Sequence, residues 1–588
     1  MAKQLSGLCA SFCVPSLFFF PRVTTLLTPP LFPSYTHPPD KSKVGPANNS
    51  LASNPRLEGP NNSKTRTYKD FMTSQGNPTR FMSRKNGATA TTLLGAAVAI
   101  LLMLAVSGAD AGSPFRLATG HRDVCVLGGG AAGMAAAVFA KDRGHSVVVI
   151  ESADRVGGQC DTIDFAAPAP GMPSWIDIGV QFFANTTAAN EVGLGPWTID
   201  SVGIVQRFAG PGSVYPLDFT TDTTPNYAVN LLQGVSYGFQ PPVPPTPEFL
   251  AAYYRLSVII ASYPWIDRAE VPSPVPAELL VPFSQFIATH DLGPLVPSLF
   301  VPQLSGGGLG AFDKLTTLYA LLNLSPTISR IFSVPYAGFV VAGGCRGIYD
   351  GMRAYLTADD ANNVLVNAKT LIAVRPYSPR LPVIVGGTLT TPNGNGLAGS
   401  FTYVCGKLIV AYAQTEQNMK PLALDAAERR LFKEVRQRYY FTGTIAAAGP
   451  VADGGAFNML NMDPTSPFGT PALPAVTQIT RGLPYGPVQF KATSQEPISV
   501  AAMRQVVIEQ LARMPASLLT NTTAVDELLL HAFQPHFTDA ELARSGGAYA
   551  ALEALQGHRK TYYVGALKNF AVTYQLWQAS YDLVANRI

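Results

Sequence analysis

The feature that most constrains this chain is an apolar strand that runs directly into a glycine-rich turn. The strand ends at Leu127, and residues 128–133 have the spacing Gly-x-Gly-x-x-Gly and open an alanine-rich helix. In such a turn the first glycine permits the bend, the second lets the backbone approach a diphosphate, and the third lets the helix pack on the strand. A second apolar strand ends in an acidic residue that can accept both hydroxyls of a ribose. The sequence therefore predicts a dinucleotide site formed by Gly128, Gly130, Ala132, Gly133 and Glu151.

The same spacing recurs at residues 394–399, but no apolar strand precedes it. Because it lies between a Thr-Thr-Pro-Asn segment and an alternating strand pattern, we expect a hairpin turn there. The glycine run at residues 306–310 also lacks a preceding strand. The sequence thus predicts one nucleotide-binding fold and no second one for a nicotinamide cofactor.

Length and composition suit a globular protein. The 588 residues are 47% hydrophobic, enough for two domains or one large composite domain. The formal net charge of +4 arises in the first 111 residues, because residues 112–588 carry 31 Lys and Arg against 34 Asp and Glu. Nothing in this balance calls for a nucleic-acid partner.

An uncharged apolar run at residues 93–106 follows Arg84 and Lys85 and precedes a small-x-small sequence at 109–111. This order is typical of a secretory signal, so we expect residues 82–111, starting at Met82, to be cleaved and the protein to be secreted. Residues 1–81 would then be a disordered extension or an artefact of the gene model. The alternative is an uncleaved signal anchor, since about 20 apolar residues can span a bilayer.

Four cysteines lie beyond this leader: Cys125, Cys160, Cys345 and Cys405. Their spacing fits no zinc site, and we predict no metal. A secretory route permits disulfides. Because Cys125 lies inside a predicted buried strand, we expect it to be a small buried hydrophobic residue.

The loop after Glu151 carries an arginine and a second glycine pair, which suit a cofactor bulkier than NAD. The alternative is an ordinary glycine turn with a solvated arginine. With the strand at 175–182, this segment resembles the flavin-containing amine oxidase superfamily. The resemblance implies FAD contacts from Arg155, Gly157, Gly158, Gln159, Gly179 and Val180.

The resemblance continues to the C-terminus. Residues 341–344 open a helix, residues 364–374 alternate like a strand, and residues 408–411 resemble the strand that returns near the cofactor. The sequence Leu-Gln-Gly-x-Arg-x-Thr-Tyr-Tyr-x-Gly-Ala at 555–566 is most similar to the branch of β-cyclopiazonate dehydrogenase-like proteins and polyenoic fatty acid isomerases. It implies cofactor contacts from Gly565 and Ala566. Because this motif contains no cysteine, we expect the FAD to be non-covalent.

The resemblance implies an α/β fold with a Rossmann-like FAD-binding domain assembled from discontinuous segments, 121–200, 341–414 and 541–588. It also implies that residues 201–340 and 415–540 form an inserted α+β substrate domain, or cap. Apolar patterns at 249–254 and 315–324 indicate helices in the cap.

Catalytic side chains are hard to identify, because flavin performs the redox chemistry itself. Lys314 is a weak candidate for the lysine that amine oxidases often hold near the flavin, although a solvated lysine is the commoner case. His290, His531 and His536 could act as acid or base near neutral pH. Each is more often a structural or surface histidine.

Three functions remain open at this stage. The first is an FAD-dependent oxidoreductase that takes a hydride from an apolar or amine-bearing small molecule, with oxygen as electron acceptor. The alternative is an FAD-dependent double-bond isomerase of polyunsaturated fatty acids, in which the hydride returns to the same chain. A flavin-containing binding or structural protein is the third. Fold follows from the resemblance, whereas substrate does not.

Overall fold

The computed structural model describes residues 116–588 except 168, 195–196, 219–225, 232–234, 241–245, 392–395, 447–455, 460–465, 482–485, 517–518 and 520–524. The predicted leader lies outside the described residues. None of the helices in the described part is both long and apolar enough to cross a membrane.

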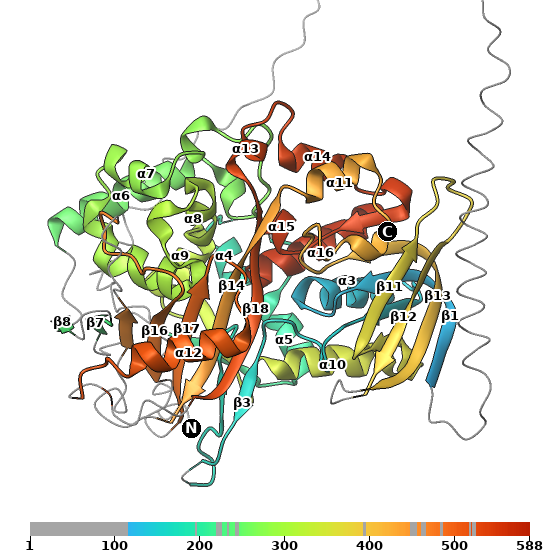
Figure 1. The fold of residues 1–588 in the computed structure, drawn as a ribbon, viewed down its shortest axis with the longest axis horizontal. Helices are drawn as coiled ribbons and strands as arrows, with labels where there is room; N and C mark the ends of the chain where they lie inside the picture. Colours follow the sequence, from blue (N-terminus) through green and yellow to red (C-terminus); the bar gives the residue numbers. More distant parts are fainter. Residues whose placement is uncertain are drawn as a thin grey trace, which may run out of the picture. The chain divides into compact units, whose positions relative to one another are not determined.

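The first sheet contains the predicted dinucleotide fold (Figure 1). Its seven strands run in the order β10-β2-β1-β13-β12-β11, and β19 pairs with β13. Strands β10, β2, β1, β13 and β19 are parallel, whereas β12 and β11 are antiparallel additions. The strands are β1 (Arg116–Leu127), β2 (Val147–Ile150), β10 (Val364–Leu365), β11 (Ala368–Val374), β12 (Val383–Thr390), β13 (Leu397–Val410) and β19 (Thr561–Tyr563).

The register of this sheet brings the ends of four parallel strands to one edge. Leu127 of β1 lies opposite Ile150 of β2 on one side and Val410 of β13 on the other, and Val410 in turn pairs with Tyr563 of β19. The loops that follow these strands therefore meet outside the carboxyl edge of the sheet, where ligands bind in open α/β folds.

Small residues let the helices pack closely on this sheet. Helix α3 (Ala131–Asp142) is built largely of buried alanines and contacts α10 (Arg346–Thr357) and α16 (Thr573–Arg587). The C-terminal helix is fixed to α3 by a hydrogen bond of 2.9 Å from Ser580 Oγ to the carbonyl of Ala132. Chain segments far apart in the sequence thus form one layer beside β1.

A second sheet has the strand order β18-β14-β17-β16-β15-β7-β8. Helix α12 (Val500–Leu511) covers one face of it, with Met503 and Val507 packed on Phe441 and Phe490 (Figure 1). The strands are β7 (Asn226–Asn230), β8 (Val235–Gln240), β14 (Val435–Ile445), β15 (Ala456–Met459), β16 (Ala475–Arg481), β17 (Val488–Ser494) and β18 (Val525–Phe537).

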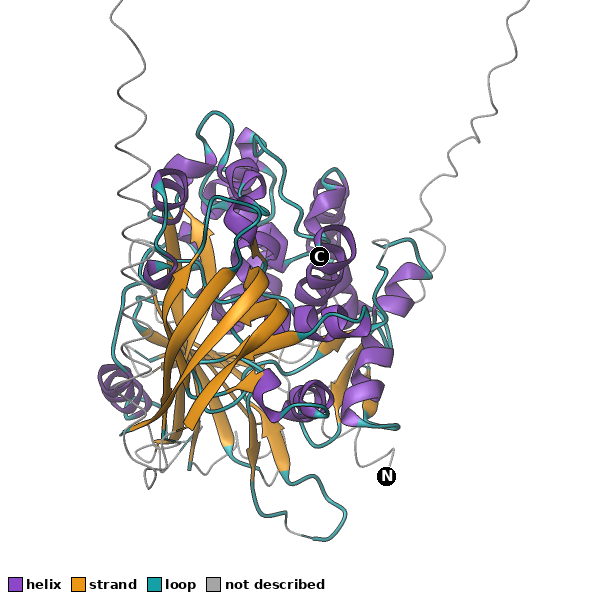
Figure 2. Cartoon of the chain, turned by 90° about the vertical axis from the view of Figure 1, so that its right-hand side faces the viewer, coloured by secondary structure: helices purple, strands orange, loops and turns teal. Residues whose placement is uncertain are grey.

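The helices expected between residues 201 and 340 are present. Helix α6 (Pro247–Ala261) begins where Thr246 Oγ1 accepts the amide hydrogen of Phe249, with proline at its first position. Figure 2 shows the helices gathered beside the strands of the sheets. The other helices of this region are α5 (Ser201–Ala209), α7 (Phe283–Thr289), the π-helical segment η6 (Val296–Leu309), α8 (Thr317–Asn323) and α9 (Pro326–Ser333).

Short elements complete the described chain. They are β3 (Thr162–Asp164), β4 (Trp175–Asp177), β5 (Phe183–Ala184), α4 (Thr186–Asn190), β6 (Val214–Leu217), β9 (Gly338–Val341), α11 (Ala426–Phe432), α13 (Asp539–Leu542), α14 (Ala548–Ala554) and α15 (Ala566–Asn569). Strands β12 and β13 are antiparallel neighbours with Thr390 opposite Leu397, which confirms the hairpin expected at the second glycine repeat. Residues 397–399 of the repeat belong to β13, and residues 394–395 lie outside the described residues.

The expectation for Cys125 is corrected by the structure. The residue is buried as predicted, but it forms a disulfide with Cys405, whose Cα atom lies 5.8 Å away. A second disulfide joins Cys160 to Cys345. The first pairing depends on β1 and β13 being neighbours although 280 residues separate the two cysteines. Spacing along the sequence carries no signal for such a contact.

Candidate functional site

The turn after β1 has the geometry that its glycines predict. Gly128 has a φ of +101°, and a Cβ atom there would lie 3.0 Å from the backbone nitrogen of Tyr412. A Cβ atom on Gly133 would lie 1.9 Å from the carbonyl oxygen of Gly128, so α3 can pack against the turn only with glycine at this position.

The N-terminus of α3 is open to an anion. Gly130 is its N-cap residue, and no side chain among the described residues caps it. A Cβ atom on Gly130 would meet only the Cα atom of Gly158, at 3.8 Å. Gly130 is therefore not required for internal packing, whereas a diphosphate approaching the amide groups of Ala131 and Ala132 would require it.

Glu151 is held at the same edge. Its Oε2 accepts the amide hydrogen of Gly129 at 2.6 Å, and its Oε1 accepts that of Ala153 at 2.7 Å. Ser152 Oγ donates a third hydrogen bond to Oε1, at 3.1 Å. An ionised carboxylate has about four acceptor sites, so about one remains for a ribose hydroxyl. The residues that the structure provides therefore fit an adenosine diphosphate group.

Arg155 does not extend away from its loop. Its guanidinium donates hydrogen bonds to the carbonyls of Gly158 (3.1 Å) and Cys160 (3.0 Å) and to the carboxylate of Asp161. The structure thus shows Arg155 fixing the shape of the loop that carries Gly157 and Gly158. The predicted direct contact between Arg155 and the cofactor stays a prediction.

Two of the predicted cofactor segments meet in space. A Cβ atom on Gly179 would lie 1.9 Å from the carbonyl oxygen of Gln159, and that oxygen accepts the amide hydrogen of Val180 at 3.1 Å. Only glycine at position 179 allows this approach.

Asp177 ties the same region to the start of α10. Its carboxylate accepts hydrogen bonds from Thr162 Oγ1 at 2.6 Å and from the amide of Cys345 at 3.0 Å. Complete burial raises the pKa of Asp177 to about 7, although both of these hydrogen bonds act in the opposite direction. The contacts give Asp177 a structural role.

The C-terminal motif reaches the edge as well. Gly565 follows β19 with a φ of +116°, and a Cβ atom there would lie 3.2 Å from the carbonyl oxygen of Ala411, which follows β13. Ala566 begins α15 immediately afterwards. The turns after β1, β13 and β19 therefore converge, as the composite site predicted from the sequence requires.

The remaining residues of this motif hold it in place. The side chain of Gln556 pairs with both backbone groups of Tyr563, at 2.8 and 2.9 Å. Arg375 and Glu428 form a completely buried ion pair beside them, with the Tyr563 hydroxyl donating to Glu428 at 2.9 Å. Burial has the largest single effect on the pKa of Glu428 and acts to raise it. The hydrogen bond and the charge of Arg375 act in the opposite direction, and the net result is a lowered pKa.

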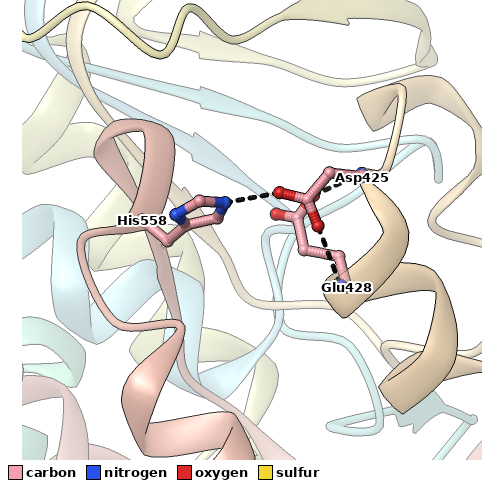
Figure 3. A group of neighbouring side chains, drawn as sticks. All are labelled: Asp425, Glu428 and His558. Atoms are coloured by element: carbon pink, nitrogen blue, oxygen red, sulfur yellow. Dashed lines mark hydrogen bonds and ion pairs between the residues drawn. The ribbon is translucent and has the colours of Figure 1, made fainter. Parts of the chain in front are cut away.

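Asp425, Glu428 and His558 are close enough to resemble a metal site (Figure 3). However, His558 Nε2 is 2.6 Å from Asp425, Asp425 caps α11, and Glu428 is paired with Arg375. These contacts already use the carboxylates, and the guanidinium of Arg375 provides the compensating positive charge. We therefore assign the group to packing of the C-terminal motif.

The second sheet contributes Ala532 and Gln489, which the sequence did not indicate, as well as His531, which it did. Gln159 Nε2 donates to the carbonyl of Ala532 in β18 at 3.0 Å, and Gln181 Nε2 donates to Gln489 Oε1 in β17 at 2.8 Å. His531 in β18 lies 3.9 Å from Asp161. The face of the second sheet opposite α12 therefore lies beside the Gln159 and Val180 segments.

This face is both polar and buried. Strand β14 directs Arg438, Tyr440 and Thr442 to it, because side chains alternate along a strand, while Phe441 packs beneath α12. The available signal was the alternation of polar residues along β14, whose residues 440–445 are all buried. It was missed because burial of both faces cannot be read from one sequence.

The glycine run at 306–310 finds its explanation on this face. A Cβ atom on Gly308 would lie 2.9 Å from Tyr440, and one on Gly306 would lie 2.7 Å from Gln478. The run lets η6 lie against β14 and β16.

The catalytic candidates are dispersed. His531 is buried, lies 2.8 Å from Thr442 Oγ1, and has its pKa lowered to about 4 by burial and then by Arg155. His536 is half-buried, with Nδ1 2.8 Å from the carbonyl oxygen of Gln534, and desolvation followed by the Arg438 charge lowers its pKa to about 4. His290 ends α7, and Lys314 is exposed in the turn before α8.

Comparisons with known proteins agree with this geometry. Residues 126–192 match the family model of the NAD(P)-binding Rossmann-like domain. An uncharacterised protein of Acanthamoeba polyphaga mimivirus is 31% identical over 83% of this chain and 97% of its own length. The FAD-dependent oxidoreductase dpasF of Apiospora sacchari is 28% identical over 78% of this chain and 90% of its own length. The β-cyclopiazonate dehydrogenase of Aspergillus oryzae is 25% identical over 76% and 88%.

Two solved structures share the fold. The fatty acid isomerase from P. acnes that produces CLA superposes with a TM-score of 0.60 at 18% identity, covering 79% of this chain and 99% of its own. Putrescine oxidase bound to putrescine superposes with a TM-score of 0.52 at 14% identity, covering 80% and 99%.

Proposed function

We propose that this chain, which belongs to the family of FAD-dependent oxidoreductases that includes the mimivirus and fungal proteins, removes a hydride from a carbon of an apolar or amine-bearing small molecule. The observation that carries the proposal is the meeting of the nucleotide-binding edge with the buried polar face of the second sheet. Gln159 and Gln181 join the two across hydrogen bonds of 3.0 and 2.8 Å.

Different residues at the edge would bind different parts of FAD. The first turn of α3, with Gly130 at its start, would bind the diphosphate, and Glu151 would accept a ribose hydroxyl. The segments around Gln159 and Val180 would lie along the flavin, and the turn at Gly565 would close the far side. When bound, flavin supplies the hydride acceptor, its N5 atom.

The second sheet would orient the substrate and exclude water. Buried polar groups on this face, including Thr442 and Gln489, can fix one orientation of a substrate, while the aromatic rings of Tyr440 and Phe533, 5.2 Å apart, provide apolar contact. His531 is neutral at pH 7 because its pKa is about 4, so it can position groups but is a weak base. We propose oxygen as the electron acceptor, since the sequence shows one nucleotide fold only.

A substrate panel tests the proposal. The purified flavin-loaded protein is mixed with polyamines, aromatic amines and linoleic or arachidonic acid, first without oxygen and then with it. We expect one class to bleach the flavin absorbance without oxygen and to release peroxide when oxygen is admitted. Formation of a conjugated diene with no peroxide would support the fatty acid isomerase instead. A colourless protein that binds NAD tightly would contradict both functions.

We also propose that residues 82–111 direct the protein into the secretory pathway. The two disulfides support an oxidising compartment. Expression from Met82 should yield a secreted protein whose N-terminal residue, found by sequencing, is Gly112. A membrane-bound chain that retains residues 93–106 would favour the signal anchor.

A further inference from the structure

Arg438 in β14 is a buried cation without a buried anion. Its side chain is 8% exposed, and it forms no ion pair with any carboxylate of the described residues. Its Nε donates to Gln534 Oε1 at 2.9 Å, while neither terminal nitrogen meets a protein acceptor in the described part of the chain. The contrast with Arg375, whose guanidinium is saturated by Glu428 and Leu422, is complete.

The two titratable groups that interact with Arg438, Tyr319 and His536, are neutral at pH 7, and the Asp539 carboxylate that acts on both of them is not among the charges that act on Arg438. Burial raises the pKa of Tyr319 well above its ordinary value, and the pKa of His536 is lowered to about 4. Burial lowers the pKa of Arg438 itself to about 10, which leaves it protonated at neutral pH. The terminal nitrogens of Arg438 are not among the wholly buried polar atoms that lack a partner, so a molecule from outside can reach them. A largely buried positive charge without a paired carboxylate is unfavourable, and an anion bound there from outside the chain would offset this cost.

Two neighbouring polar side chains also have hydrogen-bond donors without a partner in the described part of the chain. Gln534 is 1% exposed, and its Nε2 has no hydrogen-bond partner among the described residues, although its Oε1 accepts a hydrogen bond from Arg438. Tyr440, on the same face of β14, is buried against Phe533 and has no protein partner for its hydroxyl among the described residues. Donors from two adjacent strands are therefore left unused together.

We propose that Arg438 and Gln534 form an anion subsite that binds the carboxylate of an otherwise apolar substrate. The terminal nitrogens of Arg438 would donate two parallel hydrogen bonds, and the Gln534 amide a third. This inference rests on the proposed function and narrows its substrate class, because a buried guanidinium repels the ammonium group of an amine. The substrate is then an apolar acid whose chain extends along the polar face toward Gln181.

Binding of matched probes tests the subsite without turnover. Dodecanoate, dodecan-1-ol and dodecylamine share one chain and differ only in the head group. Their affinities for the flavin-loaded protein are measured by calorimetry. We expect dodecanoate to bind at least tenfold more tightly than the alcohol and the amine. Arg438→Met should weaken dodecanoate about tenfold to a hundredfold and leave the alcohol unchanged.

Two further variants keep this test decisive. Arg438→Lys preserves the charge and should retain the preference for dodecanoate at reduced strength, because lysine cannot make the paired hydrogen bonds. Arg436→Met, at an exposed arginine of the same strand, should change nothing. Equal affinities for the three probes in the wild type, or equal losses for acid and alcohol in Arg438→Met, would overturn the subsite.

Measurements of stability and of the flavin spectrum distinguish substrate binding by Arg438 from a structural role and from a role in cofactor binding. If Arg438 awaits a ligand, Arg438→Met should unfold at the same or a higher temperature than the wild type in the absence of probe. A large fall would reveal a structural partner and overturn the proposal, as would a changed flavin affinity or reduction potential, which would assign the charge to the cofactor. A carboxylate preference without flavin reduction by any substrate would contradict the oxidoreductase function alone.

Discussion

The carboxyl edge of the first sheet and the polar face of the second sheet build their sites by different means. At the edge, the site is formed mainly by backbone groups and glycines. A Cβ atom at Gly128, Gly133 or Gly565 would lie only 1.9–3.2 Å from a backbone atom of another segment or of the turn itself, so glycine is needed at these positions. On the face, the candidate groups are side chains of Arg438 and Gln489, carried by different strands and by no common motif.

This difference explains why the site at the edge could be predicted from the sequence and the site on the polar face could not. A backbone site needs a fixed order of glycines within a few residues, because the turn itself is the ligand-binding group. A side-chain site needs only that strands distant in the sequence be neighbours, as β14 and β18 are. Four predictions test this contrast, in order of decreasing effect.

The largest effect is expected on the apolar face of the second sheet. Phe490 is buried beneath α12, so Phe490→Ala should lower the free energy of unfolding by about 3–5 kcal/mol. Denaturant unfolding measures it, and Leu530→Ala, at a residue 42% exposed, is the control. A loss below 1 kcal/mol would show that this face does not support the sheet.

At the edge of the first sheet, Gly130→Val should separate cofactor binding from folding. The added methyl groups have room in the ligand-free protein but occupy the approach of the diphosphate. We expect FAD affinity to fall at least about a hundredfold, close to 3 kcal/mol, with an unchanged circular dichroism spectrum. Gly293→Ala, where a Cβ atom meets nothing within 4 Å, should retain FAD. Retention by the Gly130 variant would refute the diphosphate position.

Asp177 connects the edge to pH. Because its folded-state pKa is raised from 3.8 to about 7, the folded protein binds more protons than the unfolded chain between these values. Its contribution to stability is therefore fully present below pH 4 and is lost as the pH rises to about 7. The stability of the wild type minus that of Asp177→Asn should fall by roughly a few kcal/mol over this range.

Unfolding titrations at several pH values measure this difference. His531 and His536 act in the opposite direction, because their lowered pKa values favour the fold as the pH rises from about 4. They are present in both proteins and cancel in the comparison. A difference that does not change with pH would show that Asp177 is ionised throughout.

The smallest effect is expected beside Phe490, at Gln489. Gln489→Leu removes the hydrogen bond to Gln181 that joins the second sheet to the Val180 segment. The activation free energy of flavin reduction by substrate should change by about 0.5–1.5 kcal/mol, which corresponds to a change of about twofold to tenfold in the rate. The FAD affinity should be unchanged. Stopped-flow absorbance measures it. A loss of FAD with an unchanged rate would place the hydrogen bond in cofactor binding instead.

The sequence alone determined the nucleotide half of this protein. Strand, turn and helix follow one another between Arg116 and Asp142, and Glu151 follows at the spacing set by one helix and one strand. The resemblance at the C-terminal motif added Gly565, and contact with Ala411 confirms that it lies at the same edge. The local backbone geometry requires these residue types, so a short sequence motif is enough to predict them.

Only the tertiary structure decided the rest. The disulfide partner of Cys125 and the burial of Arg438 depend on atoms brought together from distant segments. Arg438 reads in the sequence as one of several charges in an ordinary amphipathic strand. Its separation from every carboxylate of the described residues becomes apparent once β14 is enclosed by β17, β18 and η6, because the cost of a charge depends on the surroundings that the fold provides.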